Sequence, residues 1–281
     1  MRAVQVGSDG EPTLTEVPEP DGPGEPVRVL ACGLCGSDAE KLVPAYAGAV
    51  LGHEVVGETE DGRRVALDHH ASCGDCPRCL AGHESLCEQF AAATITPGGF
   101  AERVRALGTV DLPTHWPDWR GTVVEPLACV LRGAKRVPHG RVLVVGNGFI
   151  GHLFGAVLGR RGDEVFAVDL DPRRSGPAPD GPVDAVVLCG RGGVETALEH
   201  VTPGGTMLVF ADAGAIPAAD VYRRELTVVG TRSAAPQYMP EAVALLDDLD
   251  VPEPTVLPLE RFAEGLELFR RREALKIVFT P

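Results

Sequence analysis

The chain has 281 residues, 44% of them hydrophobic, which is enough for one large or two ordinary domains with their own cores. It carries 26 basic and 40 acidic side chains, and a net charge of −14 would repel the phosphate backbone of a nucleic acid. No stretch approaches the ~18 consecutive apolar residues of a membrane span, and the N-terminus shows no apolar signal region. We therefore expect a cytoplasmic protein with neither a nucleic-acid nor a membrane partner. In that compartment its eight cysteines are metal ligands or small buried side chains rather than disulfides.

Short strands separated by Gly, Pro and Asp turns are predicted throughout the first 121 residues. The clearest of them cover residues 27–31, 55–58, 64–66 and 101–105. This half of the chain is therefore predicted to be an irregular β-rich domain.

The pattern changes at residue 122. Glu125-Pro126, followed by apolar and small residues, predicts a helix with proline at its first position. Strands and helices then alternate at the spacing of a parallel sheet with helical crossovers. The predicted strands are 141–145, 164–168, 184–188, 206–210 and 226–230, and the predicted helices are 150–160, 194–200 and 239–249. The chain is expected to end with a helix over 259–271 and a strand over 275–279.

Four cysteines at the spacing C-x2-C-x2-C-x7-C lie within fifteen residues of a polar loop. They are Cys73, Cys76, Cys79 and Cys87. Four thiolates this close together can enclose a tetrahedral Zn²⁺ without other ligands. In the iron–sulfur spacing that begins in the same way, the fourth cysteine follows after three residues. A disulfide framework would require an oxidising compartment. The spacing therefore predicts a structural zinc site.

A second motif, G-x-G-x-x-G, joins a predicted strand to a predicted helix. It runs from Gly146 through Gly148, Phe149 and Ile150 to Gly151. The three glycines allow a tight turn, close approach of a pyrophosphate to the backbone, and close packing of helix on strand. The sequence therefore predicts a dinucleotide site in the second half.

The expected ribose-binding carboxylate is Asp169, which ends the next strand and favours NAD over NADP. Arg173 and Arg174 follow closely and would soften this preference if they faced the cofactor. We expect them instead to be solvated.

Candidate ligands of a second metal are scattered over the first half. Cys35, His53 and a carboxylate, either Glu54 or Glu125, would supply three ligands and leave a fourth position open, as a catalytic zinc requires. Spacing alone does not distinguish this set from a buried cysteine and a structural histidine. The adjacent His69 and His70 are not expected to join it, because neighbouring residues on a strand point to opposite faces.

Taken in order, these motifs resemble those of the zinc-dependent medium-chain alcohol dehydrogenases, most closely the polyol, sugar and threonine dehydrogenases. The ordered motifs are Cys35-Gly-Ser37-Asp38, Gly52-His53-Glu54, the four-cysteine lobe, Glu125-Pro-Leu and the glycine loop. The resemblance implies a GroES-like catalytic domain from residues 1–121 and 249–281. It also implies a Rossmann-type NAD(P) domain over 122–248, with a cleft at their junction.

The resemblance also implies two zinc ions per chain and roles for individual residues. Cys35 and His53 would bind the catalytic zinc, with Glu125 and Glu54 completing its coordination at different stages. Asp38 would hold the imidazole of His53 in the ligating tautomer. Ser37 would take the proton of the substrate hydroxyl. The histidine that follows in the proton relay of similar enzymes is replaced here by Glu40, so either this carboxylate or water would take over.

The implied activity is hydride transfer between a secondary alcohol (a polyol, sugar, cyclitol or amino alcohol) and NAD. The alternatives are an NADPH-dependent aldehyde or ketone reductase of the same family and a non-catalytic nucleotide-binding homologue. A homodimer or homotetramer is expected.

The chain departs from the family between Asp169 and Val183, where prolines exclude a helix. A segment of this length could still connect two parallel strands as an extended strap. We therefore expect a direct connection here, with the third strand of the usual nucleotide sheet absent. The adenosine side of the pocket would then be shallow, and NAD would bind weakly or need a neighbouring subunit.

Overall fold

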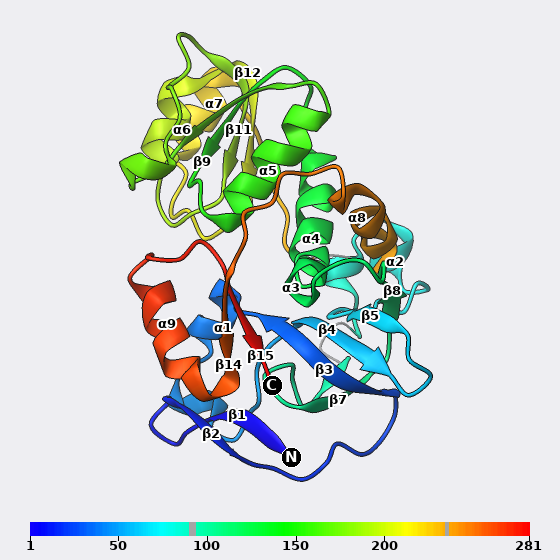
Figure 1. Cartoon of the computed structure of the whole chain (residues 1–281). Coiled ribbons are helices and arrows are strands. Elements are labelled where there is room, and N and C mark those ends of the chain that lie inside the picture. Colours follow the sequence, from blue (N-terminus) through cyan, green and yellow to red (C-terminus); the bar gives the residue numbers. More distant parts are fainter. Residues whose placement is uncertain (90–93, 234–235) are drawn as a thin grey trace. The chain divides into compact units, whose positions relative to one another are not determined.

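The computed structural model describes residues 1–89, 94–233 and 236–281. The chain forms two compact units, shown in Figure 1. Unit 1 comprises Met1–Ala128, Ala234–Leu246 and Pro252–Pro281, and unit 2 comprises Cys129–Ser233 and Asp247–Val251. In the described part of the chain, no helix combines the length and the apolar character that crossing a bilayer requires.

Unit 1 is built on an eight-stranded sheet with the order β14-β15-β3-β4-β5-β8, in which β7 also pairs with β3 and β6. Its neighbours are antiparallel except for the parallel pair β14 and β15. The strands are β3 (Glu25–Gly33), β4 (Glu54–Thr59), β5 (Arg64–Leu67), β6 (Ile95–Thr96), β7 (Arg103–Ala106), β8 (Thr109–Asp111), β14 (Thr255–Pro258) and β15 (Ile277–Thr280). A separate hairpin joins β1 (Arg2–Val6) to β2 (Pro12–Glu16).

The C-terminal strand β15 completes this sheet beside β3, so residues from both ends of the chain share one core. Along β3, buried Val27, Val29 and Ala31 alternate with more exposed positions, as a half-buried strand requires. They belong to the core that contains Phe100, Phe262 and Phe279, whose rings are packed with centroids 4.5 to 5.7 Å apart. Burying each aromatic side chain contributes about 1.5–3 kcal/mol. The strand end that carries Cys35 is therefore held on a well-packed base.

Short helices connect the strands of unit 1. These are α1 (Gly36–Glu40), α2 (Pro77–Leu80), α3 (Asp118–Gly121), α8 (Met239–Leu246) and α9 (Phe262–Arg270), while α4 (Val124–Ala134) runs on into unit 2. The 3-10 turns are η1 (Pro44–Tyr46), η2 (Glu84–Leu86), η4 (Pro236–Tyr238) and η5 (Leu259–Arg261). The prediction that Pro126 opens its helix was wrong, because α4 begins at Val124. Proline is tolerated there because the first N–H groups of a helix have no intrahelical acceptor.

Unit 2 contains a parallel five-stranded sheet with the order β10-β9-β11-β12-β13. Its strands are β9 (Arg141–Val145), β10 (Glu164–Val168), β11 (Val183–Leu188), β12 (Val201–Val209) and β13 (Thr227–Gly230). Helix α5 (Phe149–Arg160) lies on one face, and α6 (Val194–His200) and α7 (Ala218–Arg224) lie on the other (Figure 1). Helices on both faces explain why β9 and β11 are almost continuously apolar.

The strand order confirms a GroES-like unit combined with a reduced Rossmann-type sheet. The full doubly wound order is 3-2-1-4-5-6, and here β10 occupies the position of strand 2 at the edge of the sheet. Within the described residues, nothing pairs with β10 as a third strand. The expected absence of that strand is thus confirmed.

A proline-rich strap connects β10 to β11 in place of the missing strand. The segment 169–182 contains only one 3-10 turn, η3 (Pro172–Arg174). The N–H of Gly176 donates to the carbonyl of Ala167 at 2.9 Å, so the strap covers part of the open edge of β10. At the other end, Arg141 of β9 donates to the carbonyl of Pro182 at 2.9 Å and also pairs with Asp180.

The structure also differs from the predicted elements in other places. Helix α7 was not predicted, because none of its residues is buried and its sequence shows no apolar stripe. Strand β12 begins at Val201, earlier than the predicted residue 206, with an irregularity in its pairing to β11. The helix predicted over 239–249 ends at Leu246.

Candidate active site

The turn after β3 orients Cys35 and Asp38. Cys35 is the N-cap of α1, and its N–H donates to Oδ2 of Asp38 at 3.0 Å. A carboxylate at this position satisfies a backbone donor that would otherwise lack a partner at the helix N-terminus. Asp38 is only 1% exposed, so its position is fixed by these bonds and by the surrounding packing.

Asp38 also fixes the ring of His53. Its Oδ1 accepts the N–H of Gly52 at 3.2 Å and lies 3.2 Å from Nδ1 of His53. Gly52 has φ +96°, and a Cβ there would come within 2.8 Å of the backbone nitrogen of Phe100, so the turn requires glycine. With Nδ1 bonded to the carboxylate, Nε2 of His53 remains available as a metal ligand.

Burial and charge act in opposite directions on this pair. Burial disfavours charge on His53, but the carboxylate of Asp38 and its hydrogen bond raise the pKa of His53 well above its usual value. Burial likewise opposes the charge of Asp38, yet the charge of His53 and the backbone donors lower its pKa overall. The carboxylate therefore remains ionised, as a group that orients a ligating imidazole must be.

Ligand atoms of Cys35, His53 and Glu54 all lie within 4.8 Å of one another. The hydroxyl of Ser37 donates to Sγ of Cys35 at 3.4 Å, which places it beside this cluster. A thiolate, an imidazole and a carboxylate are the donor set of a catalytic zinc with an open position, so the residues fit that metal. Glu125, buried on α4, is not part of this cluster, and its role as a ligand stays a prediction.

Glu54 is engaged by a cation that the sequence analysis missed. The ammonium of Lys276 pairs with Oε2 of Glu54 and donates to the carbonyl of Leu34 at 3.1 Å. Burial lowers the pKa of Lys276, but the charge of Glu54 raises it overall. Gly33 makes room for this pair, because a Cβ there would collide with the carboxylate. No local pattern links Lys276 to Glu54, which lies 222 residues away.

His69 stacks on the proposed ligand His53, with ring centroids 4.3 Å apart and an interplanar angle of 28°. Its other neighbour is His70, at 3.9 Å. The expectation that the two histidines point to opposite faces was wrong, because β5 ends at Leu67 and strand alternation does not extend to them. Burial, followed by the nearby His53, lowers the pKa of His69 to about 2, so its ring is neutral.

The four-cysteine lobe has the geometry of a closed zinc site. With Zn–S bonds of about 2.3 Å, the edges of a tetrahedron of sulfurs are about 3.8 Å long. The Sγ atoms of Cys73 lie 3.9 Å from Cys79 and 3.5 Å from Cys87, and those of Cys76 and Cys79 are 3.5 Å apart. Backbone N–H groups of Cys76 and Gln89 donate to these sulfurs at 3.4 and 3.3 Å. The residues therefore fit a structural zinc.

Hydrogen bonds and burial shift the pKa values of the four thiols in different directions. The backbone N–H of Glu88 contributes most to lowering the pKa of Cys76 to about 6, and that of Cys73 contributes most to lowering the pKa of Cys87. The side-chain bond to Asp75 is the main cause that raises the pKa of Cys73 to about 12, and burial raises that of Cys79. All four thiols must be deprotonated when the cation binds.

In unit 2, the glycine motif connects β9 to α5 as predicted. Gly146 has φ +93°, and a Cβ there would come within 2.9 Å of the nitrogen of Gly190. Gly148 is the N-cap of α5 and faces open space, since a Cβ there would meet no atom within 4 Å. A Cβ on Gly151 would collide with the carbonyl of Gly146. The loop thus leaves room above Gly148, next to a helix N-terminus, and fits a dinucleotide.

Phe149 and Ile150 form the start of α5, with Phe149 buried. Asp169 follows β10, and its Oδ1 accepts the N–H of Asp171 at 2.9 Å. Arg173 pairs with Asp171, but its side chain is 81% exposed, so it is solvated as expected.

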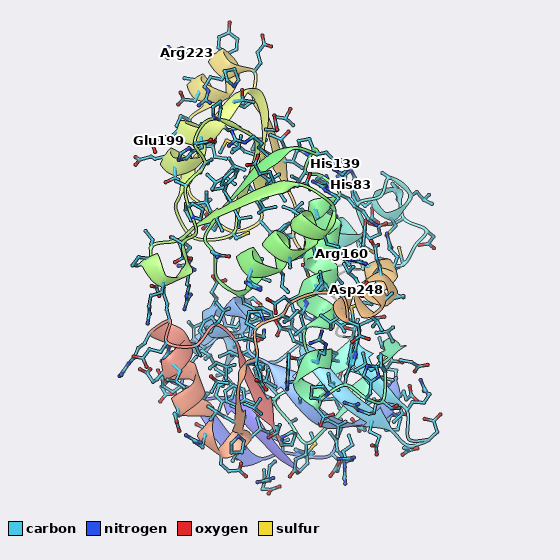
Figure 2. All side chains as sticks on the ribbon, turned by 45° about the horizontal axis from the view of Figure 1, so that its top comes forward. His83, His139, Arg160, Glu199, Arg223 and Asp248 are labelled. Carbon is cyan, nitrogen blue, oxygen red and sulfur yellow. The ribbon has the colours of Figure 1, made fainter. Side chains whose placement is uncertain are left out.

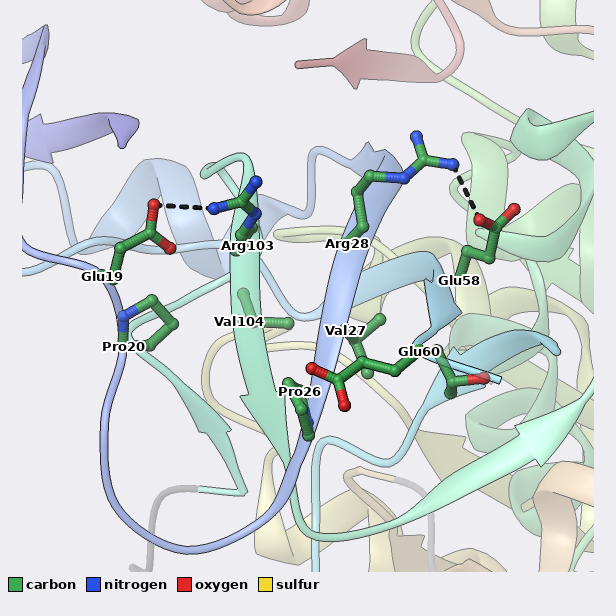
Figure 3. Close-up of a pocket in the computed structure, with 10 residues that line it drawn as sticks. Glu19, Pro20, Pro26, Val27, Arg28, Glu58, Glu60, Arg103 and Val104 are labelled. Atoms are coloured by element: carbon green, nitrogen blue, oxygen red, sulfur yellow. Dashed lines mark hydrogen bonds and ion pairs between the residues drawn. The ribbon is translucent and has the colours of Figure 1, made fainter. Parts of the chain in front are cut away.

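A pocket of about 470 Å³ lies elsewhere in unit 1, lined by residues of the paired strands β3 and β7 and by residues 19–20 and 58–60 (Figure 3). Four of its charged groups form two ion pairs, Arg28 with Glu58 at 3.1 Å and Arg103 with Glu19 at 2.9 Å, and Glu60 also lines it. None of the residues that the sequence singled out lines it. It is therefore not the candidate active site.

Comparison with known proteins identifies the family. Residues 25–113 match the alcohol dehydrogenase GroES-like domain. The chain is 31% identical to D-altritol 5-dehydrogenase of Agrobacterium fabrum over 88% of each sequence. It is 26% identical to sorbitol dehydrogenase of Halalkalibacterium halodurans, with 97% of this chain and 96% of the relative covered.

Among solved structures, a zinc-binding dehydrogenase of Sinorhizobium meliloti with NADP bound has a TM-score of 0.83 at 26% identity. That match covers 100% of this chain and 99% of the other. The sequence and the fold therefore agree on the family that the ordered motifs indicated. The chain belongs to the zinc-dependent medium-chain alcohol dehydrogenases and is an enzyme of that family.

Proposed function

We propose that this oxidoreductase transfers a hydride between a secondary alcohol and NAD, with a polyol, sugar, cyclitol or amino alcohol as substrate. The cluster of Cys35, His53 and Glu54, with Asp38 on the imidazole, is the observation that carries the proposal. Similarity to proteins named as polyol dehydrogenases supports this substrate class.

Each residue of the site has a proposed role. Cys35 and His53 hold the catalytic zinc, with Glu54 and Glu125 as further ligands at different stages. Bound zinc supplies a Lewis acid that favours loss of a hydroxyl proton, and bound nicotinamide supplies an acceptor for hydride. Ser37, whose hydroxyl is hydrogen-bonded to Sγ of Cys35, would accept the released proton on its oxygen and pass its own hydroxyl proton onward.

The proton then leaves the site by one of two routes. Glu40, the exposed last residue of α1, is the candidate acceptor, and water is the alternative. Exchange of Glu40 for glutamine separates the two, since only a carboxylate relay would lose turnover and shift its pH profile.

Unit 2 is proposed to bind the dinucleotide. The pyrophosphate would lie against Gly146, Gly148, Phe149, Ile150 and Gly151, at the N-terminus of α5. Asp169 would accept the ribose hydroxyls and thereby favour NAD. We propose that residues 1–121 and 249–281 form the catalytic domain and 122–248 the cofactor domain.

Metal analysis with paired variants tests the two zinc sites. We expect two zinc ions per purified chain, one ion in Cys35→Ser, and one in Cys76→Ser. Turnover should be lost in Cys35→Ser. A wild-type chain with one zinc that Cys35→Ser retains would contradict the proposed catalytic site.

The cofactor and substrate are tested together by kinetics with NAD and NADP against a panel of polyols, sugars and amino alcohols. Asp169→Ser is expected to weaken NAD and improve NADP, because it removes a charge that repels the 2′-phosphate. An unchanged preference would contradict the role of Asp169. The alternative, an NADPH-dependent carbonyl reductase, predicts that wild-type enzyme already prefers NADP; the NADP-bound relative keeps this alternative open.

A further inference from the structure

The segment after β10 is closed on itself and tied to the glycine loop. Oδ1 of Asp169 caps the N–H of Asp171 at 2.9 Å. The hydroxyl of Ser175 accepts the N–H of Asp169 at 2.8 Å and donates to its carbonyl at 3.0 Å. The side-chain amide of Asn147 donates to the carbonyl of Arg174 at 2.6 Å. These bonds fix the backbone of Arg173 and Arg174 relative to the glycine loop, which is proposed to hold the pyrophosphate.

Asp171 engages both arginines of this segment. Its oxygens accept from Nε of Arg173 at 3.0 Å and from Nη2 at 2.7 Å, a bidentate pair, and Oδ1 also accepts the N–H of Arg173 at 3.0 Å. Nε of Arg174 lies 3.7 Å from Oδ2. The carboxylate is mostly covered, and its bonds to Arg173 lower the pKa of Asp171 to about 2, so it stays charged. Two positive charges are thus held around one anion.

The position of Arg173 and Arg174 matters because the 2′-phosphate of NADP would need cations beside the ribose, near the segment that carries them. Guanidinium groups bind phosphate in the same bidentate geometry as carboxylate, so Asp171 competes for the groups that NADP would use. Asp169 and Asp171 together balance the charge of Arg173 and Arg174, and the segment as a whole offers no net positive charge to an anion.

We propose that Asp171 is a second cofactor-specificity residue, which excludes NADP by holding Arg173 and Arg174 away from the 2′-phosphate position. Discrimination then involves two carboxylates: Asp169 repels the phosphate, and Asp171 occupies its potential partners. This inference rests on the proposed binding of a nicotinamide dinucleotide at the glycine loop. Asp171 acts through the arginines and is a positioning residue.

Isothermal titration of NAD and NADP into the intact protein tests this inference without relying on turnover. In Asp171→Asn, NADP is expected to bind about tenfold more tightly, since one unit charge is removed and both arginines lose their contact with it. NAD affinity should change less than about threefold, because Asn still accepts hydrogen bonds at the start of η3. The NADP gain should shrink as salt is raised.

A matched control exists at the far end of α5. Asp248 pairs there with Arg160, and both residues are labelled in Figure 2. This pair lies about 16 Å along the helix from its N-terminus. Asp248→Asn also removes one negative charge and releases one arginine in unit 2, so it should leave the ratio of NADP to NAD affinity unchanged.

The triple variant D171N/R173A/R174A distinguishes two causes of a gain in NADP affinity: the loss of the contact between Asp171 and the arginines, and a general loosening of the segment. It should return NADP affinity to the wild-type value if the arginines carry the gain. A D171N protein in which both cofactors weaken equally, or a gain that survives loss of both arginines, would overturn the inference. Failure of wild-type protein to bind either dinucleotide would instead overturn the proposed function, and with it this inference.

Discussion

Lys276 and Glu54 form a buried ion pair next to the proposed zinc ligands, with both side chains at most 5% exposed. Removing one partner of such a pair leaves an uncompensated charge in a poorly solvated interior. We expect Lys276→Met to lower the free energy of unfolding by about 3–5 kcal/mol, measured by urea denaturation of protein whose catalytic site holds no zinc. The double variant E54Q/K276M should recover part of the loss, because it removes both charges.

Arg28→Met is the control for this prediction. Arg28 of β3 pairs with Glu58 of β4, but both side chains are substantially exposed, so its removal should cost far less. Equal losses in K276M and R28M would show that burial does not determine the strength of the Glu54–Lys276 pair.

Asp68, just after β5, has a buried oxygen for which the structure shows no partner. Burial raises the pKa of this carboxyl to about 6. The folded state therefore holds the proton more tightly than the unfolded chain, whose carboxyl has a pKa of about 3.9. The resulting stability is greatest at low pH, declines as pH rises from about 4 to about 6, and is flat above that range.

Asp68→Asn should remove this pH dependence. Allowing for partial solvation, we expect a gain of ~1 kcal/mol at pH 7.5, or a melting temperature ~2–4 °C higher. At pH 4.5 the gain should be clearly smaller. Scanning calorimetry at both pH values measures it, and an equal gain at both would contradict the assigned protonation.

At this scale, the sequence identified residues that carry a local pattern. Cys35, Asp38 and His53 belong to short motifs, and the structure brings all three together. Lys276 has no such pattern, and its contact depends on β15 joining β3 at the end of the chain. His69 was not predicted to lie beside His53, because the alternation of side chains along a strand was assumed to continue past Leu67, where β5 ends.

Among the elements, the strap that replaces a strand is the feature most specific to this chain. Its four prolines made it predictable that residues 169–182 would not form an α-helix. Helix α7 could not be predicted in the same way, because none of its residues is buried and its sequence has no apolar stripe. Arg141 holds the distal end of the strap through Pro182 and Asp180, and it also pairs with Glu164 at the start of β10. Its guanidinium also lies over the ring of Phe166 in β10.

We expect Arg141→Met to loosen the strap without unfolding unit 2. Hydrogen–deuterium exchange should become faster across residues 164–183, because three acceptors and a cation–π contact lose their donor together. Exchange in β12, which does not contact Arg141 through these bonds, provides the internal reference. Uniformly faster exchange in both regions would mean that Arg141 supports the whole sheet rather than the strap.

On the scale of the whole molecule, the shortened sheet should limit cofactor affinity. A third strand and its helix would normally extend the surface beside β10, where Asp169 is proposed to bind the ribose. We therefore expect NAD to bind a monomeric sample with a Kd well above low micromolar. Isothermal titration on material shown to be monomeric by light scattering measures this, and a Kd of a few micromolar or tighter would contradict it.

Assembly is the remaining prediction at this scale, and the edges of the sheets provide its test. Strand β13 ends the parallel sheet of unit 2, and its Val228 is 40% exposed. An edge strand with exposed apolar side chains is a template for pairing with a second copy, so we propose that β13 forms the interface of a homodimer or of a dimer within a homotetramer.

Val228→Lys places a charge in that interface and should shift the mass measured by light scattering toward the monomer. Val256→Lys is the matched control, because Val256 is 45% exposed on β14, the edge strand of the other sheet. A monomeric wild-type protein, or dissociation by V256K but not by V228K, would exclude β13 as the interface.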